Sequence, residues 1–262
     1  MLKENKSRKF SNGVVYALST KDGYPIEVTD TFLPAYTKDC INEKTNALKS
    51  YELGSRRDRW MIGVSVMSGC PVRCKFCATG KLKRWRNLTA NEIIAQVNFI
   101  LSKNQEINPN DSFEFKINFT RMGEPFLNID NVKEAVKSIQ SRYPKVHCYI
   151  STIGVELSNY SWITENITLQ FSIHALNEER RNWLIPYKRK MTLKEIGMIR
   201  TKSKLKTTLN LSLVDEADFD IEALKQNFDP DKFFIKISPI NPNDVSDKHG
   251  FGEGVIEKVN LI

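Results

Sequence analysis

Three cysteines stand within eight residues of one another, at Cys70, Cys74 and Cys77. Their spacing, C-x3-C-x2-C, places three thiolates on one short loop. Thiolates are the soft ligands that hold iron–sulfur clusters, and a four-iron cluster held by three cysteines keeps one iron free of protein ligands. That iron can bind a small molecule. The motif therefore predicts a [4Fe-4S] cluster that takes part in chemistry rather than one that only stores an electron.

A zinc site or a group of buried free thiols could also account for this motif. Structural zinc requires four ligands in a closed shell. The histidines are His147, His174 and His249, none near the motif in sequence, and Cys40 and Cys148 could supply only a distant fourth ligand. Five cysteines, an odd number, are also poor material for a disulfide framework and suit a metal site in a reducing compartment. The spacing favours the cluster over zinc.

The elements that must position this loop follow a regular pattern from residue 59 onward. Strand-like runs occur at residues 60–67, 113–119, 145–151, 168–173, 206–214 and 232–238. Helices are expected at 130–142, at 219–228, and after the capping boxes Thr89-x-x-Glu92 and Thr192-x-x-Glu195. Alternating strands and helices predict an α/β fold with parallel strands. Six strands fit a partial (β/α)6 barrel better than a closed eight-stranded one.

The first 57 residues read separately from this pattern. Two β-type runs, 14–18 and 26–29, flank Lys21-Asp22-Gly23 and predict a hairpin. We therefore expect a small N-terminal β-containing extension over residues 1–57 and a core over residues 58–262. In parallel α/β folds the ligand lies at the carboxyl ends of the strands, so the site is expected there.

The cysteine motif, with the aromatic Phe76 before its last cysteine, resembles the radical S-adenosylmethionine (SAM) superfamily. This resemblance implies a cluster whose open iron binds SAM and whose electron cleaves it to methionine and a 5′-deoxyadenosyl radical. Further blocks, in the same order, resemble the RlmN/Cfr subgroup of RNA adenosine methyl synthases and cover about residues 58–245. They are Cys77–Gly80, Arg86–Ile93, Met122–Pro125, Ser151–Gly154, Ser172–Ala175 and Ile240–Pro242.

The resemblance also implies which residues bind each cofactor. The three cysteines would ligate irons, and Gly123 with Glu124 would hold the amino group of SAM. The other cofactor-binding residues, including contacts to the SAM carboxylate, ribose or adenine, would be Phe76, Ser151, Ser172, Ile173, His174 and Asn241. Taken singly, the serines could be ordinary strand-end hydroxyls, and His174 a hydrogen-bonded core histidine. A glutamate near the start of the family's chains corresponds to Glu27, which is either a catalytic candidate or an exposed hairpin carboxylate.

The chain departs from the subgroup at two cysteines. One precedes the cluster motif by a strand and helps to release the methylated product, and the aligned residue here is Gly63. The other lies near the C-terminus and carries the methyl group, but no cysteine follows Cys148. The chain looks short after Pro242, which would account for the second absence and not for the first. We therefore expect SAM cleavage and hydrogen abstraction without cysteine-borne methyl transfer, with an RlmN/Cfr-type RNA adenosine methyltransferase as the alternative.

Charge indicates the kind of substrate. Lys and Arg number 39 against 31 Asp and Glu, a net charge of +8 that attracts phosphate. Residues 81–86 combine four cations with Trp85, which suits phosphates and a stacked base, although such clusters are also common on solvated surfaces. Further cations that add to this field are Lys3, Lys6, Arg8, Lys9, Arg180–Arg181 and Lys188–Lys190. We expect RNA or a nucleotide as substrate. A small metabolite or peptide, or a protein that binds cluster and SAM without turnover, are the alternatives.

Hydrophobic residues make up 40% of the chain, and the longest apolar run, residues 60–67, is too short to span a bilayer. The basic N-terminus lacks the apolar core of a secretory signal. These features predict a cytoplasmic protein that does not associate with a membrane. The resemblance implies flavodoxin or ferredoxin as the reducing partner.

Overall fold

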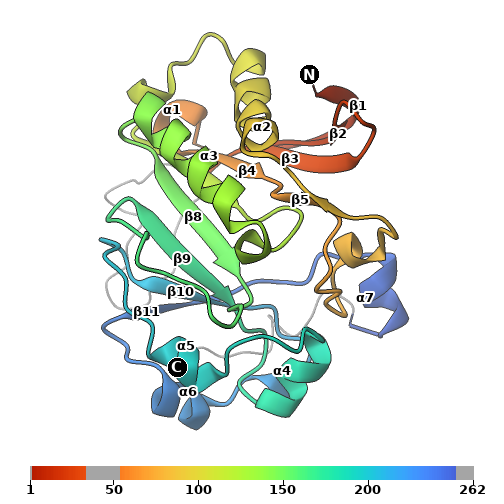
Figure 1. Ribbon diagram of the computed structural model, residues 1–262, viewed down its shortest axis with the longest axis vertical. Helices are drawn as coiled ribbons and strands as arrows, with labels where there is room; N and C mark the ends of the chain where they lie inside the picture. Colours follow the sequence, from red (N-terminus) through yellow and green to blue (C-terminus); the bar gives the residue numbers. More distant parts are fainter. Residues whose placement is uncertain (1, 34–53, 252–262) are drawn as a thin grey trace. The chain divides into compact units, whose positions relative to one another are not determined.

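A computed structural model describes residues 2–33 and 54–251, and its elements are labelled in Figure 1. The described residues form two compact units. The first comprises those within Met1–Val66, Leu88–Arg121 and Asp130–Cys148, and the second those within Met67–Asn87, Met122–Ile129 and Tyr149–Ile262. Each unit is built from stretches that are separate in sequence, so neither unit begins or ends at a single point in the chain. The boundary expected between residues 57 and 58 therefore stays a prediction.

The first unit contains the expected hairpin. Strands β2 (Gly13–Ser19) and β3 (Pro25–Phe32) pair antiparallel, which confirms the prediction. The chain adds β1 (Lys3–Phe10) against β2, a strand that the sequence did not predict because all eight of its residues are exposed and show no apolar alternation. β3 also pairs antiparallel with β4 (Trp60–Val64), which in turn pairs parallel with β7 (Glu114–Phe119).

Helices α1 (Arg56–Arg59), α2 (Ala90–Lys103) and α3 (Ile129–Arg142) and the short turn η2 (Pro109–Asp111) complete this unit, except that Ile129 belongs to the second. α2 begins with the expected capping box between Thr89 and Glu92. Buried Asp30 accepts hydrogen bonds from the indole of Trp60 at 2.8 Å and from Arg56, so one carboxylate ties β3 to β4 and α1.

The run predicted as one strand over residues 60–67 divides into β4 and the two-residue β5 (Met67–Ser68). The reason lies in the side chain of Gln96, whose Oε1 accepts from the N–H of Ser65 at 2.8 Å and whose Nε2 donates to the carbonyl of Ser65 at 2.9 Å. Since a side chain satisfies both backbone groups, the ladder ends there. β5 pairs instead with β6 (Arg86–Asn87).

The second unit contains the parallel strands β9 (Ile167–Ser172), β10 (Thr207–Leu211) and β11 (Phe233–Ile237), with β10 in the middle. β8 (His147–Thr152) contributes its first two residues to the first unit and the rest to the second. The helical elements are η1 (Ala78–Lys81), η3 (Pro125–Leu127), α4 (Glu178–Leu184), α5 (Leu193–Gly197), η4 (Glu216–Asp218), α6 (Ile221–Asn227) and α7 (Asp244–Lys248).

Apart from the divided run at residues 60–67, the predicted strands are present, as are the helices at 130–142, 192 onward and 219–228, which confirms the α/β class. The second capping box, between Thr192 and Glu195, opens α5 as expected. No helix within the described residues is both long and apolar enough to cross a bilayer.

Candidate active site

The three cysteines lie on the loop between β5 and β6, residues 69–85, here called the cysteine loop. Two hydrogen bonds join it to other segments of the second unit. The N–H of Lys75 donates to the carbonyl of Leu184 at the end of α4, at 2.9 Å. The side-chain amide of Asn243 donates to the carbonyl of Phe76 at 3.0 Å. Both bonds are made by residues between Cys74 and Cys77, so they fix the path of the loop where these thiols lie.

The thiols are close enough to influence one another. Burial raises the pKa of Cys74, and the neighbouring thiols of Cys77 and Cys70 raise it further. Burial raises the pKa of Cys70 to about 12, although the N–H groups of Val72 and Arg73 act in the opposite direction. Such thiols stay protonated in the absence of a metal, because metal binding is what releases their protons.

The turn at residues 122–125 depends on a glycine. Gly123 has a φ of 102°, and a Cβ there would lie 2.5 Å from Cγ of Met67. Glu124 is buried, with one carboxylate oxygen accepting from the N–H of Phe126 at 3.1 Å and the other from the N–H of Ile153 at 2.9 Å. Burial raises the pKa of Glu124 to about 7, and these hydrogen bonds offset part of the rise. A buried carboxylate of this kind is stabilised by a cation placed beside it.

The segment after β9 meets the cysteine loop. Ser172 ends the strand, Ile173 is buried, and His174 has a φ of 58°. Nδ1 of His174 accepts from the N–H of Ser212 at 3.0 Å, and its ring meets that of Phe76 edge-on at 4.6 Å. Burial lowers the pKa of His174 to about 3, so its ring is neutral. His174 is thus a hydrogen-bonded, buried histidine, and it also touches the loop of the cysteines.

Two other predicted site residues occupy different surroundings. Asn241 is exposed, and its carbonyl accepts from the side-chain amide of Asn243 at 2.9 Å, the same amide that reaches Phe76. Asn241 therefore lies close to the cysteine loop. The hydroxyl of Ser151 donates to Oε1 of Gln170 on β9 at 3.0 Å, which matches its alternative as an ordinary strand hydroxyl.

Glu27 and Gly63 belong to the first unit. A Cβ on Gly63 would lie 2.4 Å from Oγ1 of Thr29 and 3.0 Å from Cδ of Arg121. Arg121 also forms an ion pair with Glu27, whose side chain is 36% exposed. Glu27 is therefore an ion-paired residue of β3 rather than a free hairpin carboxylate, and neighbouring side chains occupy the space beside position 63.

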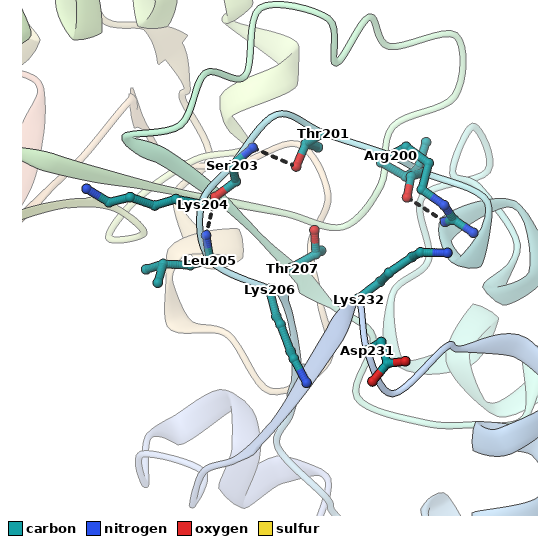
Figure 2. A pocket seen from close by; sticks show the side chains of 10 residues that line it. Arg200, Thr201, Ser203, Lys204, Leu205, Lys206, Thr207, Asp231 and Lys232 are labelled. Atoms are coloured by element: carbon teal, nitrogen blue, oxygen red, sulfur yellow. Dashed lines mark hydrogen bonds between the residues drawn. The ribbon is translucent and has the colours of Figure 1, made fainter.

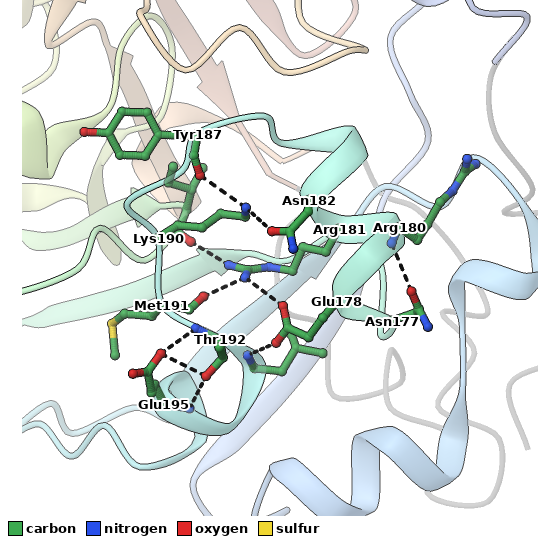
Figure 3. Close-up of polar contacts among 12 residues, drawn as sticks. Asn177, Glu178, Arg180, Arg181, Asn182, Tyr187, Lys190, Met191, Thr192 and Glu195 are labelled. Atoms are coloured by element: carbon green, nitrogen blue, oxygen red, sulfur yellow. Dashed lines mark hydrogen bonds and ion pairs between the residues drawn. The ribbon is translucent and has the colours of Figure 1, made fainter.

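Arg181 is a site residue that the sequence did not reveal (Figure 3). Its side chain is fully buried on α4, where Nη1 donates to the carbonyl of Met191 at 2.6 Å and Nη2 to that of Ile153 at 2.8 Å. Its buried Nε has no hydrogen-bond partner among the described residues. Grouping Arg181 with Arg180 as surface charge was wrong, because successive helical residues point about 100° apart. Its spacing of three from Leu184, a buried residue of the same helix, is the signal that could have found it.

Lys190 also departs from the expected surface field. It is 8% exposed and donates to the side chain of Asn182 and to the carbonyl of Tyr187. Arg180 lies nearer the surface and pairs with buried Asp218 at 2.8 Å. Lys190 and Arg180 both bond to other groups of the protein. The cysteine loop and other exposed segments therefore remain to attract an anionic partner.

The donor set of the second unit fits an iron–sulfur cluster. Across residues 2–33 and 54–251, no three His, Cys, Asp or Glu side chains meet closely enough to hold a single metal ion. A four-iron cluster does not require that, because each cysteine binds a different iron. The unpartnered Nε of buried Arg181 likewise fits a group of negative charge at the cysteine loop.

Comparison with known proteins assigns the chain to a superfamily. The family model of the Radical SAM superfamily matches residues 64–226, and the chain belongs to that superfamily. Its members use a [4Fe-4S] cluster together with SAM. The fold is shared with a radical SAM methyltransferase from Sphaerobacter thermophilus, with a TM-score of 0.70 and 22% identity over 98% of this chain and 71% of that one. The expected fold class is thereby confirmed.

Within the superfamily, the chain is similar to RlmN proteins. It is 30% identical to a probable dual-specificity RNA methyltransferase RlmN of Chlorobium phaeobacteroides, over 74% of this chain and 54% of that protein. It is 34% identical to the probable dual-specificity RNA methyltransferase RlmN of Dictyoglomus turgidum, over 54% of this chain and 42% of that protein. The chain thus spans about half the length of the curated relatives it matches.

Proposed function

We propose that this chain is a radical SAM enzyme that binds a [4Fe-4S] cluster through Cys70, Cys74 and Cys77, cleaves SAM reductively and removes a hydrogen atom from its substrate. One observation carries this proposal: a single compact unit holds all three cysteines together with the Glu124 turn and the His174 segment. When bound, the cluster supplies the electron that divides SAM into methionine and a 5′-deoxyadenosyl radical. Flavodoxin or ferredoxin is the proposed source of that electron.

The chain's own residues bind and orient SAM in this proposal. Gly123 and Glu124 hold its amino group, since the glycine admits close approach and the buried carboxylate gains a cationic partner. His174 stays neutral and keeps its segment in place through the N–H of Ser212. The remaining contacts to SAM come from Phe76, Ser151, Ser172, Ile173 and Asn241.

We propose that position 63 takes no part in methyl transfer. Glycine offers neither a nucleophile nor a general base, and Thr29 and Arg121 fill the space that a side chain there would need. Arg121 holds the carboxylate of Glu27 in an ion pair, and Glu27 is the candidate for proton transfer to or from substrate.

RNA is the proposed substrate class, because the Chlorobium and Dictyoglomus relatives are both called RNA methyltransferases. The exposed part of the cysteine loop supports it: Trp85 is 46% exposed and follows the exposed cations Lys83 and Arg84. An aromatic ring beside cations can stack on a base while the cations meet phosphates.

A cavity of about 280 Å³ at the amino ends of β10 and β11 offers a further place where an anion could bind (Figure 2). Its cations are Arg200, Lys204, Lys206 and Lys232. The cationic ends of Arg200 and Lys232 turn toward each other, with Asp229 pairing Lys232 at 2.8 Å. The carboxyl ends of the same strands lead to the proposed SAM segments, so this cavity would bind phosphates remote from the reacting group.

The proposed reaction is tested by anaerobic reconstitution with iron and sulfide, followed by SAM and dithionite, with mass spectrometry of the products. Formation of 5′-deoxyadenosine without S-adenosylhomocysteine is expected. Substantial S-adenosylhomocysteine would instead favour the RlmN/Cfr-type methyltransferase. A protein that holds a full cluster but forms neither product, even with RNA present, would contradict turnover and favour a binding protein.

Binding of transfer and ribosomal RNA at several salt concentrations tests the substrate class. Affinity is expected to fall steeply with salt, and replacement of Lys83 and Arg84 by Glu should reduce both affinity and the salt dependence. Lys137→Glu, at an exposed position of α3, is the matched control and should have the smaller effect. Weak, salt-insensitive binding would favour a small metabolite or peptide.

A further inference from the structure

Two buried cations of the second unit, Arg181 and Lys190, have no buried acid as an ion-pair partner among the described residues. Arg181 is fully buried and Lys190 is 8% exposed. The ion-pair partner of Arg181 within the described residues is Glu178, at 3.6 Å, with a side chain that is 41% exposed. The other carboxylate oxygen of Glu178 accepts from the N–H of Leu193. Burying a charge without a close partner is costly, so this arrangement requires a further anion.

The helix that carries Arg181 adjoins the cysteine loop. α4 carries Arg181 in its middle and presents the carbonyl of Leu184 at its end, where it accepts from the N–H of Lys75, the residue after Cys74. Cys74 is one of the groups that act electrostatically on both Arg181 and Lys190. The missing anion would therefore belong at the thiolates.

Hydrogen bonds fix where the guanidinium lies (Figure 3). Its Nη2 donates to the carbonyl of Ile153, whose own N–H donates to Glu124, and its Nη1 donates to the carbonyl of Met191. The N–H of Met191 in turn donates to the carbonyl of Gly154. Ile153 thus contacts both Arg181 and the proposed SAM-binding carboxylate of Glu124, and two carbonyls hold the guanidinium in place.

We propose that Arg181 is a positioning residue whose buried charge balances the anionic cluster and favours the cluster's uptake of one electron. This inference rests on the proposed function, because it needs a cluster at the cysteine loop. A nearby positive charge stabilises the more negative, reduced form, and full burial of Arg181 strengthens this effect because little water screens its charge. Arg181 touches neither substrate nor the reacting atoms in this proposal.

The test is an EPR-monitored redox titration of the reconstituted protein, with iron and sulfide content measured in each variant. In Arg181→Met the equilibrium constant for one-electron reduction is expected to fall tenfold or more, which is about 59 mV in midpoint potential. Arg181→Lys keeps the charge and should stay within threefold of the wild type. Arg180→Met, one residue away on the same helix and 34% exposed, is the matched control and should not change the potential.

A second variant keeps the proposal falsifiable where Arg181→Met takes up no cluster. Glu178→Gln retains an oxygen for the N–H of Leu193 but removes the negative charge near Arg181, so reduction should become easier than in the wild type. A cluster-loaded Arg181→Met protein at the wild-type potential, or an unchanged Glu178→Gln protein, would overturn the proposal alone. A wild-type protein that binds no cluster would overturn the proposed function as well.

Discussion

Replacing Gly63 with alanine is expected to lower the free energy of unfolding by about 1 to 3 kcal/mol, the usual cost of overpacking a well-filled site. The added Cβ would lie 2.4 Å from Oγ1 of Thr29, which pairs with Gly63 directly across β3 and β4. Thr29 is buried and its side chain is short, so it has little room to move aside. The contact with Arg121, at 3.0 Å, is easier to relieve because that side chain is long.

A double-mutant cycle with Thr29→Ala measures this clash. Urea unfolding of the cluster-free protein gives the four stabilities, and the double variant should recover at least half of the loss, with a coupling energy of about 1 kcal/mol or more. The melting temperature should follow at about 2 to 4 °C per kcal/mol. Wild-type stability in Gly63→Ala, or additivity with Thr29→Ala, would refute the claim that Thr29 fills this position. Either result would also leave the absence of a cysteine at position 63 without a steric explanation.

Three further outcomes are expected. Cys74→Ala should abolish the brown absorption of the reconstituted protein, whereas Cys148→Ala, at a buried cysteine of β8, should keep it. If both variants keep the brown absorption, the assignment of the cluster to this loop is wrong. The cluster-free protein should lose stability as the pH rises from about 4.5 to about 7, because folded Glu124 keeps a proton that the unfolded chain has released. In urea unfolding at a series of pH values, Glu124→Gln should lack this pH-dependent loss of stability. Identical profiles for the variant and the wild type would contradict the prediction. Lys206→Glu should weaken RNA binding and lower its salt slope, and an unchanged slope would exclude the cavity at β10 and β11 from the RNA contact.

Much of the fold could be predicted because its signals are local. The capping boxes at Thr89 and Thr192 and the apolar runs of the core strands depend on neighbouring residues, and the structure contains all of them. β1 could not be predicted, since its eight exposed residues gain their strand conformation only from pairing with β2. The end of β4 could not be predicted either, because it depends on hydrogen bonds between Ser65 and the side chain of Gln96, which lies 31 residues away.

The candidate site divides in the same way. The cysteine spacing and the Gly123-Glu124 turn are short motifs and were visible in the sequence. Arg181 was not, because its role follows from full burial and from carbonyls 10 and 28 residues away. The sequence alone does not distinguish the adjacent cations Arg180 and Arg181. Their positions on helix α4 show that Arg181 is the buried one.

Strand β1 has a consequence for how this protein behaves at high concentration. Among the described residues it lies at the end of the strand order and pairs with β2 alone, so its outer backbone groups form an open edge in this part of the chain. Open edges invite pairing with a second chain, and charged side chains are a common natural protection against it. Lys3, Lys6, Arg8 and Lys9 place four cations along this edge. When two copies approach edge to edge, these lysines and the arginine repel each other, so the residues that look suited to RNA also keep one copy from joining its sheet to the next.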